Sequence, residues 1–244
     1  MNEPMLESAK ALRALMERSR NIVFFGGAGV STESGIPDFR SAHGMYTADK
    51  SYEDMLSIRF FLNRPDEFWD FYKHVMLYPN AKPNAAHYAL ARLEKQGKLK
   101  AVVTQNIDGL HQDAGSQRVL ELHGTVRRNL CMSCRRVYPL DYVLAAEGTP
   151  RCECGGMLRP DVVLYGEPLD NDVMDAATRA VLRSDLLIVG GTSLTVYPAA
   201  GLLNYRDRAK LALLNRDETP FDSRADLIAR ESIATVLDQA IPAE

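Results

Sequence analysis

A glycine-rich stretch that follows an apolar run is the most chemically informative segment of this chain. Residues 21–25 have the composition of a buried strand, and Gly26, Gly27, Ala28 and Gly29 follow directly. Because almost no side chains are present there, backbone N–H groups can approach a ligand closely, and pyrophosphate is the usual ligand of such a loop. The segment therefore predicts a nucleotide-binding loop at the end of a strand.

The residues after this loop do not continue as a conventional dinucleotide-binding helix. The glycines are not spaced as G-x-G-x-x-G, which a typical NAD-dependent dehydrogenase requires. Residues 34–37, Ser-Gly-Ile-Pro, cannot extend a helix, and Asp38, Phe39 and Arg40 follow them. We interpret the segment as a loop that holds a nucleotide cofactor which the protein breaks.

The four cysteines of the chain form two close pairs, Cys131 with Cys134 and Cys152 with Cys154. This arrangement suits a tetrahedral zinc ion bound by four thiolates, and such a closed site leaves no position for water. We therefore expect a structural zinc ion. The second pair has one intervening residue where two are usual, so its turn must differ. A zinc ribbon that binds nucleic acid is the alternative, but we interpret the nearby arginines as a solvated face. They are Arg127, Arg128, Arg135 and Arg136.

His123 is the histidine best placed for acid–base chemistry. It follows the apolar run 119–122 and precedes Gly124, where the cysteine-bearing segment begins. An imidazole near its ordinary pKa can take up a proton at neutral pH. His87 and His111 fall within expected helices, where a structural role is the default.

Apolar strand-like runs alternate with helical segments along the chain. Strands are expected at 21–25, 101–103, 119–122, 162–165, 186–189 and 211–214, and helices at 5–18, 84–96, 170–183 and 197–207. This pattern predicts an α/β fold whose mostly parallel sheet is covered on both faces. Ligands bind such sheets at the carboxyl ends of the strands. Small or polar residues collect at those ends: Gly29, Gln105, Asn106, Asp108, His123, Ser193 and Asn215.

The bulk composition narrows the class of protein. The chain has 244 residues, enough for one large α/β domain with a small insertion, and its net charge is -3. Nothing indicates direct nucleic-acid or membrane binding, and no apolar run approaches a membrane span. The N-terminus lacks the regions of a signal peptide, so we expect a cytoplasmic protein.

Taken together, these motifs resemble those of the sirtuins, the NAD-dependent protein-lysine deacylases, in their zinc-containing bacterial type. The matching stretches lie in the family's order, at 27–40, 104–108, 123–124, 131–154 and 191–194. The resemblance implies a Rossmann-like, doubly wound parallel sheet for NAD, formed by residues 1–40, 84–125 and 161–244. It also implies a smaller domain, made of a helical insertion at 41–83 and a zinc-binding insertion at 126–160.

The resemblance further implies NAD-dependent removal of acetyl groups from lysines of partner proteins or peptides, giving nicotinamide, O-acetyl-ADP-ribose and free lysine. His123 would be the general base, Asn106 would position ribose and water, and Asp108 would accept from the nicotinamide amide. NAD is the implied co-substrate and zinc the structural metal. The implied NAD contacts are Ala28, Gly29, Ser31, Thr32, Ile36, Phe39, Arg40, Tyr46, Gln105, Asn106, Ile107, Asp108, His123, Gly191, Thr192, Ser193, Asn215 and Ile233.

Three alternatives remain open at this point. An ADP-ribosyltransferase would share the NAD site, although the complete set of Gln105, Asn106, Asp108 and His123 favours deacylation. A zinc-stabilised binding module would not need the polar strand ends. A deacylase with another acyl preference is the third. In sirtuins that prefer acidic acyl groups, an arginine follows a tyrosine by three residues in the helical insertion. We align Tyr72 with the tyrosine, so an apolar Val75 would occupy the arginine position.

Overall fold

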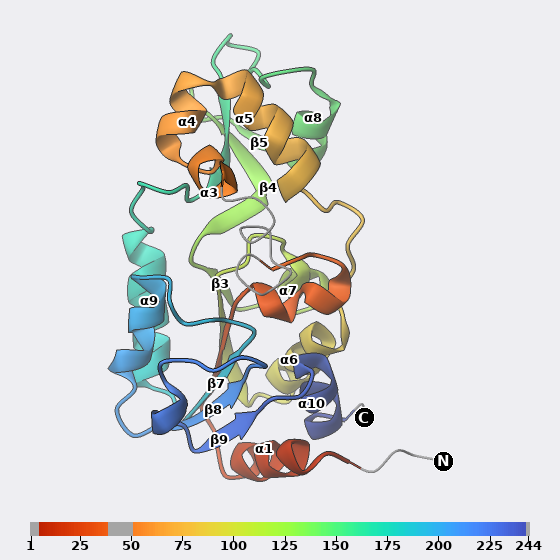
Figure 1. Cartoon of the computed structure of the whole chain (residues 1–244), viewed down its shortest axis with the longest axis vertical. Helices are drawn as coiled ribbons and strands as arrows, with labels where there is room; N and C mark the ends of the chain where they lie inside the picture. The colour runs from red at the N-terminus through yellow and green to blue at the C-terminus, as the bar shows by residue number, and fades with distance from the viewer. Residues whose placement is uncertain (1–4, 39–50, 243–244) are drawn as a thin grey trace.

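Two separate sheets organise the computed structural model, which describes residues 5–38 and 51–242 (Figure 1). The larger sheet has six strands that pair in parallel in the order β3-β2-β1-β7-β8-β9. Its strands are β1 (Ile22–Gly26), β2 (Leu99–Thr104), β3 (Val119–Glu121), β7 (Leu186–Gly190), β8 (Lys210–Leu214) and β9 (Leu227–Ala229). This is the strand order of a doubly wound, Rossmann-like sheet, so the predicted fold class is confirmed.

Helices cover both faces of the large sheet. On one face α1 (Glu7–Glu17), α6 (Ala85–Lys95) and α10 (Ile233–Ala240) pack over Ile22 and Phe24 of β1. On the other face, the α-helix α9 (Asn171–Leu182) and the 3₁₀ helix η4 (Ala199–Tyr205) pack over Val23 and Phe25 (Figure 1). Since alternate side chains of a strand point to opposite faces, a strand buried on both sides reads as a continuous apolar run.

Side-chain caps explain where several helices begin. The Asn84 side chain accepts from the Ala86 N–H at the start of α6, and the His87 ring accepts from the Asn84 N–H. Asp170 accepts from two N–H groups at the start of α9, and Ser232 caps α10. Such caps satisfy N–H groups that have no partner within the helix.

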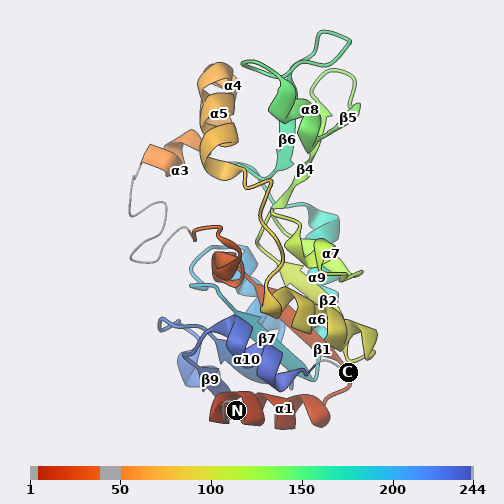
Figure 2. The same ribbon diagram turned by 90° about the vertical axis from the view of Figure 1, so that its right-hand side faces the viewer.

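The smaller sheet is antiparallel, with the order β5-β4-β6. Its strands are β4 (Gly124–Cys131), β5 (Val137–Pro139) and β6 (Leu158–Val162), and α8 (Leu140–Ala145) follows β5. Beside it lie α3 (Ser51–Met55), α4 (Ile58–Asn63), α5 (Pro65–Phe71) and the π-helical turn η3 (Tyr72–Met76). Both parts share one aromatic-rich core, and Figure 2 places them at the end of the molecule away from α1.

Two sequence predictions about the elements are wrong. The run 162–165 is not a strand of the large sheet, because β6 ends at Val162 and pairs with β4 in the small sheet. The helix expected at 197–207 is the shorter 3₁₀ helix η4. The apolar pattern of the sequence also did not predict β9, which has only three residues, or α10. Among the described residues, no helix combines the length and apolarity that a bilayer span requires.

Candidate active site

A cavity of ≈ 870 Å³ lies at the carboxyl ends of β1, β2, β7 and β8 and extends to the small sheet. Ligands bind at this edge of open α/β sheets. Every predicted NAD contact that the structure describes lines the cavity: Ala28, Gly29, Ser31, Thr32, Ile36, Gln105, Asn106, Ile107, Asp108, His123, Gly191, Thr192, Ser193, Asn215 and Ile233. Phe39, Arg40 and Tyr46 lie outside the described residues.

The glycine-rich loop after β1 packs backbone against backbone on the loop after β7. The Gly29 N–H donates to the Gly191 carbonyl oxygen over 2.8 Å, and a Cβ on Gly29 would lie 2.7 Å from the Gly191 Cα. Gly191 has a φ of 62°, and a Cβ there would lie 2.4 Å from the Val30 nitrogen. Only glycines permit this approach, which leaves a wall with little side-chain bulk, as a diphosphate requires. The loop therefore fits a dinucleotide.

Asn106, Ser31 and Asp108 form a hydrogen-bonded chain in the lining of the cavity. The Asn106 amide donates to the Ser31 hydroxyl over 3.0 Å, and that hydroxyl donates to the Asp108 carboxylate over 2.7 Å. The other carboxylate oxygen accepts from the Leu110 N–H over 2.9 Å. A carboxylate offers about four acceptor positions, so Asp108 retains capacity for an amide donor of a ligand.

The His123 ring is oriented by the backbone of the neighbouring strand end. Its Nδ1 lies 2.9 Å from the Gln105 carbonyl oxygen. A carbonyl oxygen only accepts, so Nδ1 carries the proton and Nε2 of the neutral ring carries the lone pair. Gly124 follows with a φ of 76°, and a Cβ there would lie 2.0 Å from the Asp161 carbonyl oxygen. This tight turn places His123 between the two sheets with Nε2 suited to accept a proton.

The loop after β7 also lines the cavity, through Gly191, Thr192 and Ser193. The Thr192 hydroxyl donates to the Gln105 side chain over 2.8 Å and accepts from the Leu194 N–H over 3.2 Å. Ile233 begins α10 and packs against Gly190, where a Cβ would lie 2.1 Å from its Cδ1. These contacts place polar groups and one apolar side chain in this part of the cavity.

Two loops that follow β6 and β7 also line the cavity, through Gly166, Glu167, Leu169, Val196 and Tyr197. Arg159 holds Glu167 with two hydrogen bonds of 2.7 and 2.8 Å, and the Leu164 N–H donates to the same carboxylate. Burial by itself would raise the pKa of Glu167, but these hydrogen bonds hold it below its ordinary value. The ion pair therefore ties the end of the small sheet to this loop.

The small-sheet end of the cavity has an apolar wall that the sequence patterns did not indicate. Leu56, Tyr72, Met76 and Val126 line it, and Val75 does not. Residues 72–76 form a π-helical turn, and Met76, four positions after Tyr72, joins it in this wall. The Tyr72 ring is fully buried, and burial raises the pKa of its hydroxyl.

Arg127, which was expected on a solvated face, also lines the cavity. It forms an ion pair with Asp113, and its guanidinium lies over Gly109. The pairing brings β4 against α7 (Leu110–Asp113). The absence of a side chain at Gly109 leaves room for the guanidinium, because a Cβ there would lie 2.1 Å from the Arg127 Nε. No sequence pattern indicated this contact.

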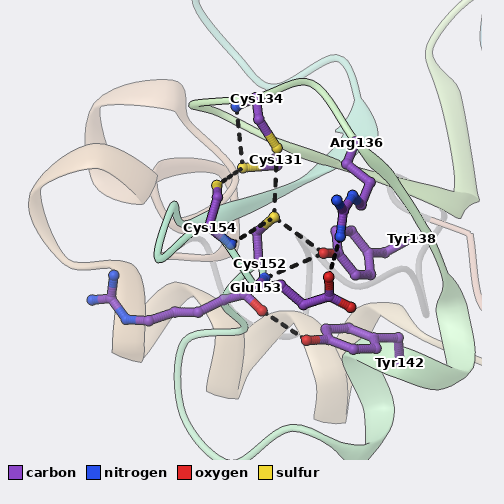
Figure 3. A network of polar contacts seen from close by, with 9 residues as sticks. Cys131, Cys134, Arg136, Tyr138, Tyr142, Cys152, Glu153 and Cys154 are labelled. Carbon is purple, nitrogen blue, oxygen red and sulfur yellow. Dashed lines mark hydrogen bonds and ion pairs between the residues drawn. The ribbon is translucent and has the colours of Figure 1, made fainter.

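The four cysteines converge in one cluster at the far end of the small sheet (Figure 3). Their sulfur atoms all lie within 4.8 Å of one another, with 3.6 Å between Cys131 and Cys154 and 3.5 Å between Cys134 and Cys152. Zinc–sulfur bonds of about 2.3 Å in a tetrahedron require sulfurs about 3.8 Å apart, so the cluster fits a zinc ion. It lies outside the cavity lining, as expected for a structural metal.

Comparison with known proteins assigns the chain to a family. A family model described as "Sir2 family" matches residues 27–198. A curated NAD-dependent protein deacetylase of Clostridium perfringens is 54% identical over 243 residues, covering 97% of this chain and 100% of that protein. Its counterpart in Sulfolobus acidocaldarius is 49% identical over 246 residues, covering 97% of this chain and 95% of that protein. The chain belongs to the Sir2 family, as the resemblance to sirtuins predicted.

Solved structures agree with this assignment. A structure described as "Sir2-p53 peptide-NAD+" is 40% identical and aligns with a TM-score of 0.84, covering 94% of this chain and 95% of that chain. A second, described as "Structural Basis for the Mechanism and Regulation of Sir2 Enzymes", is 39% identical, has a TM-score of 0.86 and covers 96% of both chains. The likeness therefore extends over both sheets.

Proposed function

We propose that this protein is an NAD-dependent deacetylase that removes acetyl groups from lysine side chains of proteins. Its products are nicotinamide, O-acetyl-ADP-ribose and the free lysine. The observation that carries the proposal is the His123 ring, whose Nδ1 is held by the Gln105 carbonyl within the cavity that the glycine loop borders. The relatives' activity, at 54% identity over nearly the whole chain, supports the same reaction.

NAD supplies, when bound, a ribose carbon that accepts the acetyl oxygen as nicotinamide leaves. The chain's own residues have separate tasks. The backbone at Ala28 and Gly29 holds the diphosphate, and Asp108 accepts from the carboxamide. The Asn106 amide is fixed by Ser31 and orients ribose and water. His123 takes up a proton at Nε2, because its other ring nitrogen is held by a carbonyl oxygen.

The acetyl-lysine enters between the segments 166–169 and 195–197, whose backbones offer the edges on which an extended peptide can add as a strand. Its acyl group points toward the wall formed by Leu56, Tyr72 and Met76. None of these three residues has a basic side chain, so the wall suits a neutral acyl group. A carboxylate placed there would lose its hydration without an ion pair, which costs several kcal/mol.

Other parts of the proposal follow from the sequence patterns. The NAD-binding domain comprises 1–40, 84–125 and 161–244, and the small domain comprises 41–83 and 126–160. Cys131, Cys134, Cys152 and Cys154 hold zinc as a structural ion that keeps the small sheet in place. The protein acts in the cytoplasm, without direct nucleic-acid or membrane partners.

Mass spectrometry of an acetyl-lysine peptide, incubated with and without NAD, tests the proposal. We expect deacetylation only with NAD, with one nicotinamide released per acetyl group lost, and a reaction about 10²–10⁴-fold slower with the His123→Ala variant. The alternative on the same site is transfer of ADP-ribose to protein. It would release nicotinamide while the peptide keeps its acetyl group and a protein gains the mass of ADP-ribose, and that result would overturn deacetylation.

A further inference from the structure

The loop that follows β6 is fastened both to the His123 turn and to the start of α4. The Val163 N–H donates to the His123 carbonyl oxygen over 3.0 Å. Two residues later, the Tyr165 N–H donates to the Leu56 carbonyl oxygen, and the Tyr165 carbonyl oxygen accepts from the Ile58 N–H, both over 3.0 Å. The chain then continues from the small sheet to α9 beside the large one (Figure 1). This loop therefore joins the helical segment to the turn that carries His123.

A single carboxylate closes the next part of this loop. The Glu167 carboxylate accepts from the Leu164 N–H over 3.0 Å, and the Leu164 carbonyl oxygen accepts from the Glu167 N–H over 3.0 Å. Arg159 of β6 donates to both carboxylate oxygens over 2.7 and 2.8 Å, and the same guanidinium donates to the Val162 carbonyl oxygen over 3.1 Å. A bidentate pair of this kind fixes direction as well as distance. The turn 164–167 is therefore locked to the end of β6.

The turn offers its backbone to the cavity, and its charge is already paired. Only 21% of the Arg159 side chain and 19% of the Glu167 side chain are exposed. The guanidinium neutralises the carboxylate, so Glu167 presents no unpaired charge to a ligand. Gly166, within the turn, has a φ of 91° and lines the cavity. A glycine can line a cavity only through its backbone, so the locked turn determines where backbone groups meet a ligand.

We propose that Glu167 is a positioning residue for the acetyl-lysine peptide: held by Arg159, it keeps the backbone of residues 166–169 in place as the edge on which the peptide adds as a strand. This inference rests on the proposed deacetylase function. Strand addition uses backbone groups, so affinity depends on an edge that is ordered before the peptide arrives. An edge with one freed residue must be ordered on binding, which weakens binding about tenfold.

The first test measures the KM for an acetyl-lysine peptide in the unchanged protein, in Glu167→Gln and in Arg159→Met. The glutamine replaces one acceptor oxygen by a donor that faces the guanidinium, and the methionine removes the guanidinium itself. We expect the KM for the peptide to rise about tenfold in each variant, while kcat and the KM for NAD stay within about twofold. An equal rise in the KM for NAD would overturn the proposal.

The double variant tests whether the two residues act through one contact. Its KM for the peptide should not exceed that of either single variant by more than about twofold, because both changes break the same pair. Effects that multiply would contradict the proposal. If Glu167→Gln does not fold, Arg159→Met carries the same comparison with the unchanged protein.

Arg128→Met is the matched control. Arg128 of β4 pairs with Asp161 of β6 over 2.8 Å, so it also makes an arginine–carboxylate contact within the small sheet. Neither residue lines the cavity. We expect its KM for the peptide to stay within about twofold of the unchanged value. A tenfold rise in this control would show that loss of any such pair has the same effect, which would contradict a specific role for Glu167.

Two acetylated peptides separate positioning from direct contact, one rich in lysine and arginine and one without further charges. Backbone pairing is the same for both, so Glu167→Gln should raise both KM values by similar factors. A rise confined to the basic peptide would show that the carboxylate contacts the charges of the peptide, and the proposal would then be wrong.

Hydrogen exchange of the free protein tests the locked turn without any reaction. We expect the amides of residues 163–169 to exchange about tenfold faster in Glu167→Gln and Arg159→Met than in the unchanged protein or in Arg128→Met. Unchanged exchange would overturn the proposal, because the turn would then be ordered without the pair. If the unchanged protein deacetylated neither peptide, the proposed function would fail, and the exchange rates would still decide whether Glu167 orders the turn.

Discussion

The buried histidine pair of α6 and α7 makes stability sensitive to mild acid. The rings of His87 and His111 lie 4.8 Å apart, and neither is more than 1% exposed. Burial lowers the pKa of His87 to about 4, although Asp108 opposes this shift. Burial, together with the neighbouring His87, lowers the pKa of His111 to about 3. Both rings are therefore neutral in the folded protein at pH 5.

The sign of the effect follows from proton binding. In the unfolded chain a histidine titrates near pH 6.5, so below that pH the unfolded state binds more protons than the folded state. Stability is complete above pH 6.5 and falls as the pH drops toward the folded-state values. At pH 5 each ring costs about 1.36 × (6.5 − 5), or about 2 kcal/mol, and the pair about 4 kcal/mol. As long as the pKa values of both rings in the folded protein lie below 5, this loss depends only on the pKa of histidine in the unfolded chain.

Replacing His111 by leucine removes one of these titrations and places an apolar side chain beside Phe24. Urea unfolding of the unchanged protein and of His111→Leu, followed by circular dichroism at pH 7.5 and pH 5.0, measures the effect. We expect the loss of unfolding free energy between the two pH values to be about 2 kcal/mol smaller in the variant. The absolute stability of the variant at pH 7.5 does not enter this difference.

His74→Leu is the matched control, because the His74 side chain is 73% exposed. The control should retain the whole acid-dependent loss. If His111→Leu showed the same pH dependence as the unchanged protein, the argument from burial would be refuted. A loss that shrank equally in both variants would also count against it.

Three further outcomes are expected. His123→Ala should lower NAD-dependent deacetylation by about 10²–10⁴-fold at an unchanged melting temperature, and near-normal turnover would remove His123 from the mechanism. Metal analysis should find one zinc ion per chain, and Cys134→Ser should lose it and lower the stability of the small sheet; a metal-free active protein would contradict this. The kcat/KM on an acetylated peptide should exceed that on its succinylated form, because Tyr72 and Met76 offer no cation. Equal values would show that the apolar wall does not select the acyl group.

Local chemistry was enough to predict much of this protein. The glycine loop, the polar strand ends and the paired cysteines are recognisable because each depends on residue type over a few positions. The predicted NAD contacts that the structure describes line one cavity, and the cysteine sulfurs lie within 4.8 Å of one another. Alternation of apolar strands with helices also predicted the parallel sheet, since burial on both faces leaves a continuous apolar run.

The errors concern elements whose identity depends on distant partners. Residues 158–162 form a strand because they pair with β4, with Leu158 opposite Cys131, and an apolar run cannot indicate which sheet it joins. Likewise, the turn at 72–76 is π-helical, and Met76 in that turn lines the cavity, which no sequence pattern indicated. A shift of one residue in a helix changes which side chain faces a ligand.

The sequence by itself therefore determined the class of protein and the residues available for its chemistry, because those residues are specified by type and by short spacing. Only the tertiary structure decided how they are held. The Gly29–Gly191 contact and the carbonyl that orients His123 both join segments distant in the chain. Such contacts form because strand pairing and core packing bring these segments together, and no local pattern encodes that geometry.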